Sequence, residues 1–172
     1  MKYKNPQLHS LDYYFQNIMI AQKYLKQFHL LMDPQSVILD CCYFPSHSDK
    51  AFYLQVKKDR EQYLGHCAYT YYADYFEMES YSQSFLTVER ADSNTAKRGD
   101  VICKILQLDT SLIEDLITAV QAYMPTPKDI KIVIDGIYAN IRLFEKGEIV
   151  SDIRLTHDSK IVDSLTAISK QL

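Results

Sequence analysis

The chain has 172 residues, 47% of them hydrophobic and 24% charged, which is ordinary for a globular domain and excludes intrinsic disorder. The formal net charge is −3 and no long run of Lys or Arg occurs, so the electrostatic footprint of nucleic-acid binding is missing. The sequence has no signal-peptide pattern and no apolar run near the roughly 20 residues of a membrane span. We therefore expect a cytoplasmic protein with neither a membrane nor a nucleic-acid partner.

The first predicted element is an amphipathic helix over residues 10–31. Ser10 suits the N-cap position and Asp12 the first turn, where the helix dipole favours an anion. Asp33 and Pro34 end the pattern. The apolar residues that recur at steps of three and four are Leu11, Tyr14, Phe15, Ile18, Ala21, Leu25 and Phe28.

A run of strands follows this helix. Residues 36–44 are almost continuously apolar, which is typical of a central strand. Residues 51–57 alternate, with Phe52, Leu54 and Val56 on one face. Further strands are expected over residues 63–80, 84–90 and 101–108. The polar, breaker-rich residues 91–100 are predicted to form a mobile loop.

A second helix is predicted over residues 111–124. Ser111 and Glu114 have the spacing of a capping box, and Pro125 and Pro127 follow the last apolar position.

The C-terminal third predicts a β-meander and then a helix. Residues 130–134 alternate up to Asp135-Gly136, a hairpin signal that would set Ile132 opposite Ala139 and Ile130 opposite Ile141. The next turn is predicted to be a bulged three-residue loop at Glu145, Lys146 and Gly147, with Leu143 paired to Ile149. Asp158 is the expected cap of a third helix over residues 158–171.

Strands that come in runs predict an α+β fold with a mainly antiparallel sheet. About three helices (10–31, 111–124 and 158–171) are expected to pack on this sheet. We expect a single domain of residues 1–172, with two sub-lobes, 1–109 and 110–172, as the alternative.

No catalytic, cofactor or metal motif stands out in the sequence, so we expect no cofactor, no metal and no enzymatic activity. The cysteines lack the paired spacing of structural zinc sites and are predicted to be reduced, buried thiols. They are Cys41, Cys42, Cys67 and Cys103. An enzyme site assembled from scattered residues stays open as an alternative, with His47, Asp49, His66 and Asp40 as its candidates.

Tyrosine is over-represented, with 14 Tyr against 7 Phe and no Trp, and residues 69–79 hold four of the 14 together with three acids. Exposed rings among carboxylates favour binding of a basic protein, because the rings supply buried area and the carboxylates steer association. The alternative is an edge hairpin whose acids discourage aggregation. The predicted partner-binding residues are Tyr71, Tyr72, Asp74, Tyr75, Glu77 and Glu79.

Residues 128–172 follow the pattern strand, Asp-Gly, strand, Gly, strand, helix. This hydrophobicity pattern resembles the C-terminal part of many small uncharacterised bacterial proteins, among them immunity proteins that neutralise toxins of contact-dependent or secreted antibacterial systems. The resemblance implies a protein-binding module that inhibits a basic partner, such as a toxin domain. A small-ligand binder or structural subunit that uses the 91–100 loop is the alternative.

Overall fold

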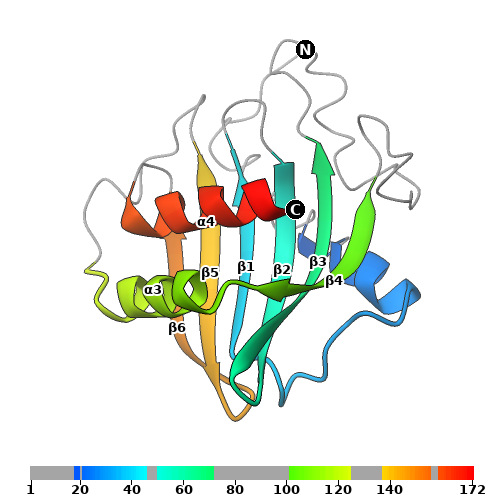
Figure 1. Ribbon diagram of the computed structural model, residues 1–172, viewed down its shortest axis with the longest axis horizontal. Coiled ribbons are helices and arrows are strands. Elements are labelled where there is room, and N and C mark those ends of the chain that lie inside the picture. The colour runs from blue at the N-terminus through cyan, green and yellow to red at the C-terminus, as the bar shows by residue number, and fades with distance from the viewer. Residues whose placement is uncertain (1–17, 20, 46–49, 72–100, 125–136, 156–158) are drawn as a thin grey trace, which may run out of the picture.

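The computed structural model describes residues 18–19, 21–45, 50–71, 101–124, 137–155 and 159–172. Within these residues the chain forms a six-stranded antiparallel sheet with helices on both faces (Figure 1). The predicted α+β class with an antiparallel sheet is therefore confirmed. In the part of the chain described, no helix is long and apolar enough to cross a membrane.

The strands lie in the order β4-β3-β2-β1-β5-β6, so that the first strand is central. Their bounds are β1 (Leu39–Phe44), β2 (Lys50–Asp59), β3 (Gln62–Tyr71), β4 (Ile102–Leu108), β5 (Tyr138–Glu145) and β6 (Glu148–Leu155). All six residues of β1 are buried, as its continuous apolar run predicts for a strand covered on both faces.

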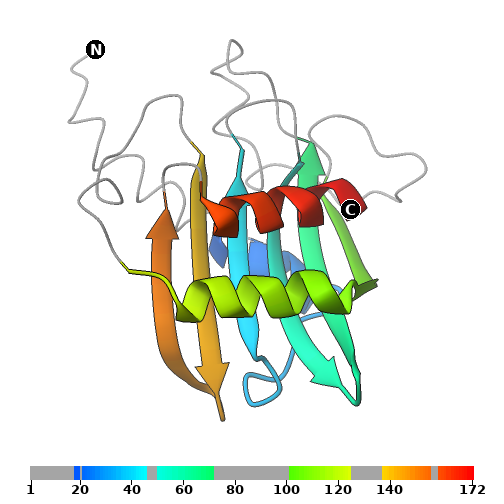
Figure 2. The same cartoon turned by 60° about the vertical axis from the view of Figure 1, so that its left-hand side comes forward.

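Two helices, α3 (Thr110–Gln121) and α4 (Lys160–Gln171), cross one face of the sheet side by side (Figure 2). The alternating side chains Phe52, Leu54 and Val56 of β2 point into the core beneath them. The helix that contains residues 21–27 covers part of the opposite face, where Ala21 and Leu25 belong to the same buried cluster as Tyr53. The sheet thus has a hydrophobic core on each side.

The first predicted helix extends too far at its C-terminal end. Residues 18–19 and 21–27 are helical, whereas residues 10–17, with the expected Ser10 cap, lie outside the described residues. The helix closes at His29, whose φ of 57° is left-handed, and Leu30 N donates to Leu25 O at 2.7 Å. The chain then leaves the helix before residue 31.

The N-caps of α3 and α4 differ from the predicted ones. Asp109, not Ser111, caps α3: its Oδ1 accepts from Leu112 N at 3.0 Å and from Ser111 Oγ at 2.6 Å. Ser159 caps α4 through its contact with Val162 N, and the expected cap, Asp158, lies outside the described residues. In each case the cap accepts from the residue three positions ahead, as N-cap geometry requires.

The predicted pairing of the C-terminal meander is wrong. Over residues 139–143, β5 pairs with β1 on one side and with β6 on the other. Both sides of Ala139 and Ile141 are therefore occupied, and these residues cannot also pair with Ile132 and Ile130. Residues 130–134 and the Asp135-Gly136 turn lie outside the described residues, as do the expected strand 84–90 and loop 91–100. What the structure shows at this end is a strand pair, β5 and β6, followed by α4.

The turn between β5 and β6 has two residues rather than the predicted three. Lys146 (φ 51°) and Gly147 (φ 81°) both have positive φ, as a type I′ hairpin turn requires, and Glu145 pairs with Glu148. The bulge lies further along, where the register shifts between Leu143 and Phe144. That shift sets Ile141 opposite Ile153, so the apolar residues return to one face by a bulge at a different place.

We expect Gly147→Ala to lower the free energy of unfolding by about 1 kcal/mol, because a side chain disfavours the left-handed conformation. The added Cβ would also lie 2.5 Å from Gln35 Nε2, which must move. Lys146→Asn should instead raise stability, because it creates the Asn-Gly pair preferred in such turns. Urea unfolding of both variants checks this, and a stabilising Gly147→Ala would contradict the turn assignment.

Candidate functional site

A row of side chains crosses the whole sheet on the face that carries the N-terminal helix. Each member lies directly opposite the next in the strand register. From β4 to β6 the row reads Ile105, His66, Gln55, Asp40, Arg142 and Asp152. Five of these six side chains are polar, which is unusual for a sheet face so close to a core.

The centre of the row is an ion pair between Asp40 in β1 and Arg142 in β5. Arg142 Nε donates to Asp40 Oδ1 at 2.7 Å, and its Nη2 donates to Oδ2. The side chain of Asp40 is only 4% exposed and that of Arg142 is 26% exposed. Burial opposes the charge on Arg142, but the hydrogen bonds and charge of Asp40 outweigh it and raise the pKa of the guanidinium.

Tyr53 extends the pair toward the N-terminal helix. Its hydroxyl donates to Asp40 Oδ2 at 3.0 Å and accepts from Gln22 Nε2 at 2.8 Å. Burial and the charge of Asp40 raise the pKa of Tyr53 far above its usual range, so the hydroxyl remains a proton donor. Within the described residues the carboxylate therefore accepts three hydrogen bonds, one from Tyr53 and two from Arg142.

The other polar members of the row also have specific partners. His66 Nδ1 contacts Leu30 O at 2.6 Å, and Gln55 Oε1 accepts from Met32 N at 3.0 Å. These two contacts fix the segment between the helix and β1 onto the sheet. At the far end, Asp152 accepts from Asn140 Nδ2 at 2.7 Å.

Of the four candidates for a scattered enzyme site, the structure describes Asp40 and His66. Asp40 and His66 share the polar row, but Gln55 lies between them and each is bound to a different partner. His47 and Asp49 lie outside the described residues. As far as the described residues extend, Asp40 and His66 stabilise the packing of the sheet.

The four cysteines are all buried, with no disulfide among them, as predicted for reduced core thiols. Burial raises the pKa of Cys42 to about 12. Burial, with the neighbouring Cys42, raises the pKa of Cys41 as well, and burial with Cys103 raises that of Cys67. These thiols stay protonated at neutral pH and are therefore poor nucleophiles. Among the residues described, no three His, Cys, Asp or Glu side chains form a group that could hold a metal.

Several tyrosines are used inside the core rather than on the surface. Tyr43 lies beneath α4 with its hydroxyl 2.9 Å from Thr166 Oγ1, which itself donates to Val162 O. Because the oxygen of Thr166 has given its hydrogen, Tyr43 is the donor. Among the tyrosines that the structure describes, the buried ones are Tyr43, Tyr53, Tyr63, Tyr69 and Tyr138. These five tyrosines therefore belong to the core and do not offer surface to a partner.

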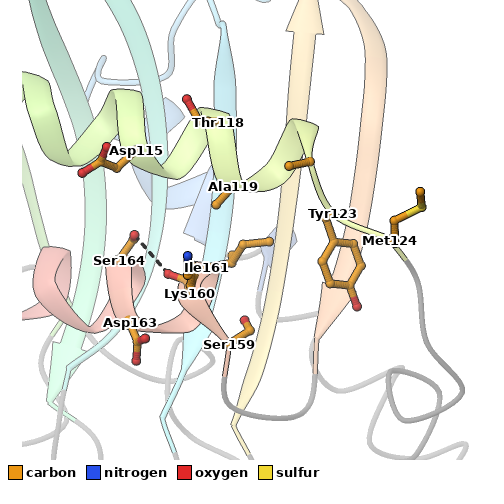
Figure 3. Close-up of a pocket in the computed structure, with 11 residues that line it drawn as sticks. Asp115, Thr118, Ala119, Tyr123, Met124, Ser159, Lys160, Ile161, Asp163 and Ser164 are labelled. Atoms are coloured by element: carbon orange, nitrogen blue, oxygen red, sulfur yellow. Dashed lines mark hydrogen bonds between the residues drawn. The ribbon is translucent and has the colours of Figure 1, made fainter.

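On the opposite side of the molecule, an open groove of about 700 Å³ runs between α3 and α4 (Figure 3). Ala119 lies on its α3 side and Ser164 on its α4 side, with Ile161 between them. Tyr123 and Met124 lie at the end of the groove beyond α3. The full lining is Asp115, Thr118, Ala119, Ala122, Tyr123, Met124, Ser159, Lys160, Ile161, Asp163 and Ser164. Sequence patterning did not reveal this groove, although the 115, 118, 119, 122 spacing marks one helix face.

Of the predicted partner-binding residues, only Tyr71 belongs to a described element. It is the last residue of β3 and lies opposite Lys50. Tyr72, Asp74, Tyr75, Glu77 and Glu79 lie outside the described residues. The acidic, tyrosine-rich stretch therefore continues directly from the end of an inner strand.

We expect Arg142→Met to lower the free energy of unfolding by about 3–5 kcal/mol, because it leaves the buried Asp40 carboxylate without its cation. Adding Asp40→Asn should recover part of this loss by removing the buried charge. Arg154→Met is the control, since the Arg154–Asp152 pair is exposed on both sides and worth less than about 1 kcal/mol. Urea unfolding would contradict the central role of the pair if the two arginine variants lost equal stability.

We expect the native protein to react slowly with Ellman's reagent at pH 8, and all four thiols to react at once in guanidinium chloride. The reason is that burial hinders access and keeps Cys42, with its pKa of about 12, protonated. Rapid reaction of one cysteine per folded chain would show that at least one thiol is accessible and contradict this prediction.

Comparison with known proteins adds no relative from which a role could be transferred. The roles of the buried polar row, the α3–α4 groove and the stretch that follows β3 are therefore inferred from this chain alone. No protein-family model, curated protein or solved structure matches the chain.

Proposed function

We propose that this chain is a protein-binding module, an inhibitor of the toxin-immunity kind that holds a basic partner protein. The proposed contact residues are Tyr71, Tyr72, Asp74, Tyr75, Glu77 and Glu79. The tyrosine rings would supply contact area at low entropic cost, and the three carboxylates would steer a cationic partner toward them.

The observation that supports this proposal is where β3 ends. Tyr71 lies at the edge of the sheet at which β1 also ends and β5 begins, since Lys50 pairs with Tyr71 and Phe44 pairs with Tyr138. At the same edge β4 begins and β6 ends (Figure 2). Residues 72–101 therefore join strand ends at an edge shared by all six strands. Connections that leave a rigid scaffold at a common edge are a frequent place for binding residues.

The opposite edge of the sheet is closed differently. There β2 and β3 are joined by a turn at Arg60 and Glu61, and β5 and β6 by the turn at Lys146 and Gly147. Each of these connections is only two residues long. This asymmetry favours the edge at Tyr71 as the contact surface.

The test begins with capture of the tagged chain from its host at moderate salt, followed by titration calorimetry with the purified partner. We expect Glu77→Lys with Glu79→Lys to weaken binding by about ten-fold or more, because two steering carboxylates become repulsive. Affinity of the unmodified chain should also fall as salt rises.

The control carries the same charge change at the opposite edge of the sheet, in Glu145→Lys with Glu148→Lys. Both residues flank the tight turn and should leave affinity within about two-fold of the unmodified chain. If both double variants lost the same affinity, the loss would come from the change in net charge and not from a contact at Glu77 and Glu79. An unchanged affinity for the Glu77 and Glu79 variant would remove these residues from the contact surface.

A further inference from the structure

We infer that the groove between α3 and α4 is a second docking surface, which receives a cationic amphipathic helix of a partner protein. This inference rests on the proposed function only in assigning the chain to protein recognition. It uses none of the residues from Tyr71 to Glu79, so the two surfaces can be tested separately.

The walls of the groove allow a helix to approach closely. Its α3 side presents Thr118, Ala119 and Ala122, and its α4 side presents Ser159 and Ser164. Side chains this small leave the helix backbones accessible, and packed helices need axes only about 8–10 Å apart. The opening of about 700 Å³ lies between two helices and is open rather than enclosed, which leaves it accessible to a partner helix.

One end of the groove carries apolar anchors. Met124 is 80% exposed, the largest exposed fraction among the large hydrophobic side chains described, and Tyr123 beside it is half-buried. Methionine and tyrosine are both enriched at protein interfaces, because the first adapts its shape and the second combines apolar area with a hydroxyl. An apolar stripe on the incoming helix would bury Met124, which is otherwise left in water.

The charges that border the groove favour a cationic partner. Asp115 on α3 and Asp163 on α4 line it, against Lys160 alone. Because α3 contains no Lys or Arg along its whole length, its side of the groove carries the carboxylate of Asp115 and no cation. Lysine or arginine on the polar side of the bound helix would therefore meet carboxylates.

The same charges argue against a second copy of this chain as the occupant. A two-fold contact of groove on groove would place two carboxylates and one ammonium from each chain at a shared interface. Such a contact gathers net negative charge, which disfavours association. A partner helix with lysines avoids that repulsion.

The probe is a fluorescein-labelled helical peptide with Leu on one face and Lys on the other, and its binding is followed by fluorescence anisotropy. A peptide with Glu in place of each Lys serves as the reference. We expect the lysine peptide to bind the unmodified chain and the glutamate peptide to bind at least about ten-fold more weakly.

Two matched pairs of variants locate the binding. Asp115→Lys, within the groove, should weaken binding of the lysine peptide by about ten-fold, whereas Glu114→Lys, its neighbour outside the lining, should change it less than about two-fold. Ala122→Trp should block the groove, whereas Gln121→Trp should not. All four residues are exposed, so the substitutions leave the core intact, and circular dichroism verifies folding.

Equal losses within either pair would overturn the inference, as would equal binding of the two peptides. The variant with Glu77→Lys and Glu79→Lys separates the two proposals in the same assay. It should bind the peptide like the unmodified chain while losing affinity for the captured partner. If instead it alone loses the peptide, the groove is not the docking surface and the acidic stretch is.

Discussion

Asp40 places a negative charge in the most buried strand of the sheet, and the arrangement of one whole face follows from the need to neutralise it. An unpaired carboxylate at 4% exposure would cost several kcal/mol. Arg142 supplies the cation from the neighbouring strand, and Tyr53 supplies a further donor. Gln22 then ties the N-terminal helix to that donor. One charge thus connects a helix and three strands.

The two faces of the sheet are stabilised in different ways. Under α3 and α4 a large apolar core sets the position of the helices by shape and volume, and a few hydrogen bonds add to it, such as Tyr43 to Thr166 and Ser169 to the backbone of Lys50. On the other face, polar contacts such as Gln55 to Met32 and His66 to Leu30 fix directions as well as distances. The apolar layer leaves the outer sides of its helices available for recognition, and the polar layer holds the chain entering β1 in register.

Much of the fold could be predicted because its signals are local. The continuous run ending at Phe44 marked a central strand, and the alternation around Leu54 marked a strand with one apolar face, although the structure buries both faces of β2. The helices expected over residues 111–124 and 158–171 are present as α3 and α4, which bury Leu116 and Leu165. Cap positions were missed by one or two residues, since Asp109 and Ser159 compete with equally suitable neighbours.

What could not be predicted depends on residues far apart in the chain. The Asp135-Gly136 signal suggested a local hairpin, but β5 takes β1 as its partner from across about a hundred residues, because that pairing buries both strands. The ion pair between Asp40 and Arg142 depends on the same pairing of β1 with β5. The groove is likewise a product of how two separate helices meet, and no single segment encodes it.

The place of β1 at the centre of the sheet has a consequence for how the chain folds. Four strands, β1 to β4, can pair in chain order as they are synthesised, but the other edge of β1 stays open until residues 138–145 emerge. That edge belongs to the apolar segment Leu39–Phe44, the kind of strand that pairs readily with other chains. Pairings at such long separation also slow folding. A chain interrupted before β5 would therefore leave one edge of β1 unpaired and Asp40 without the cation of Arg142. Such a chain is prone to aggregation and is a suitable target for early removal by proteases.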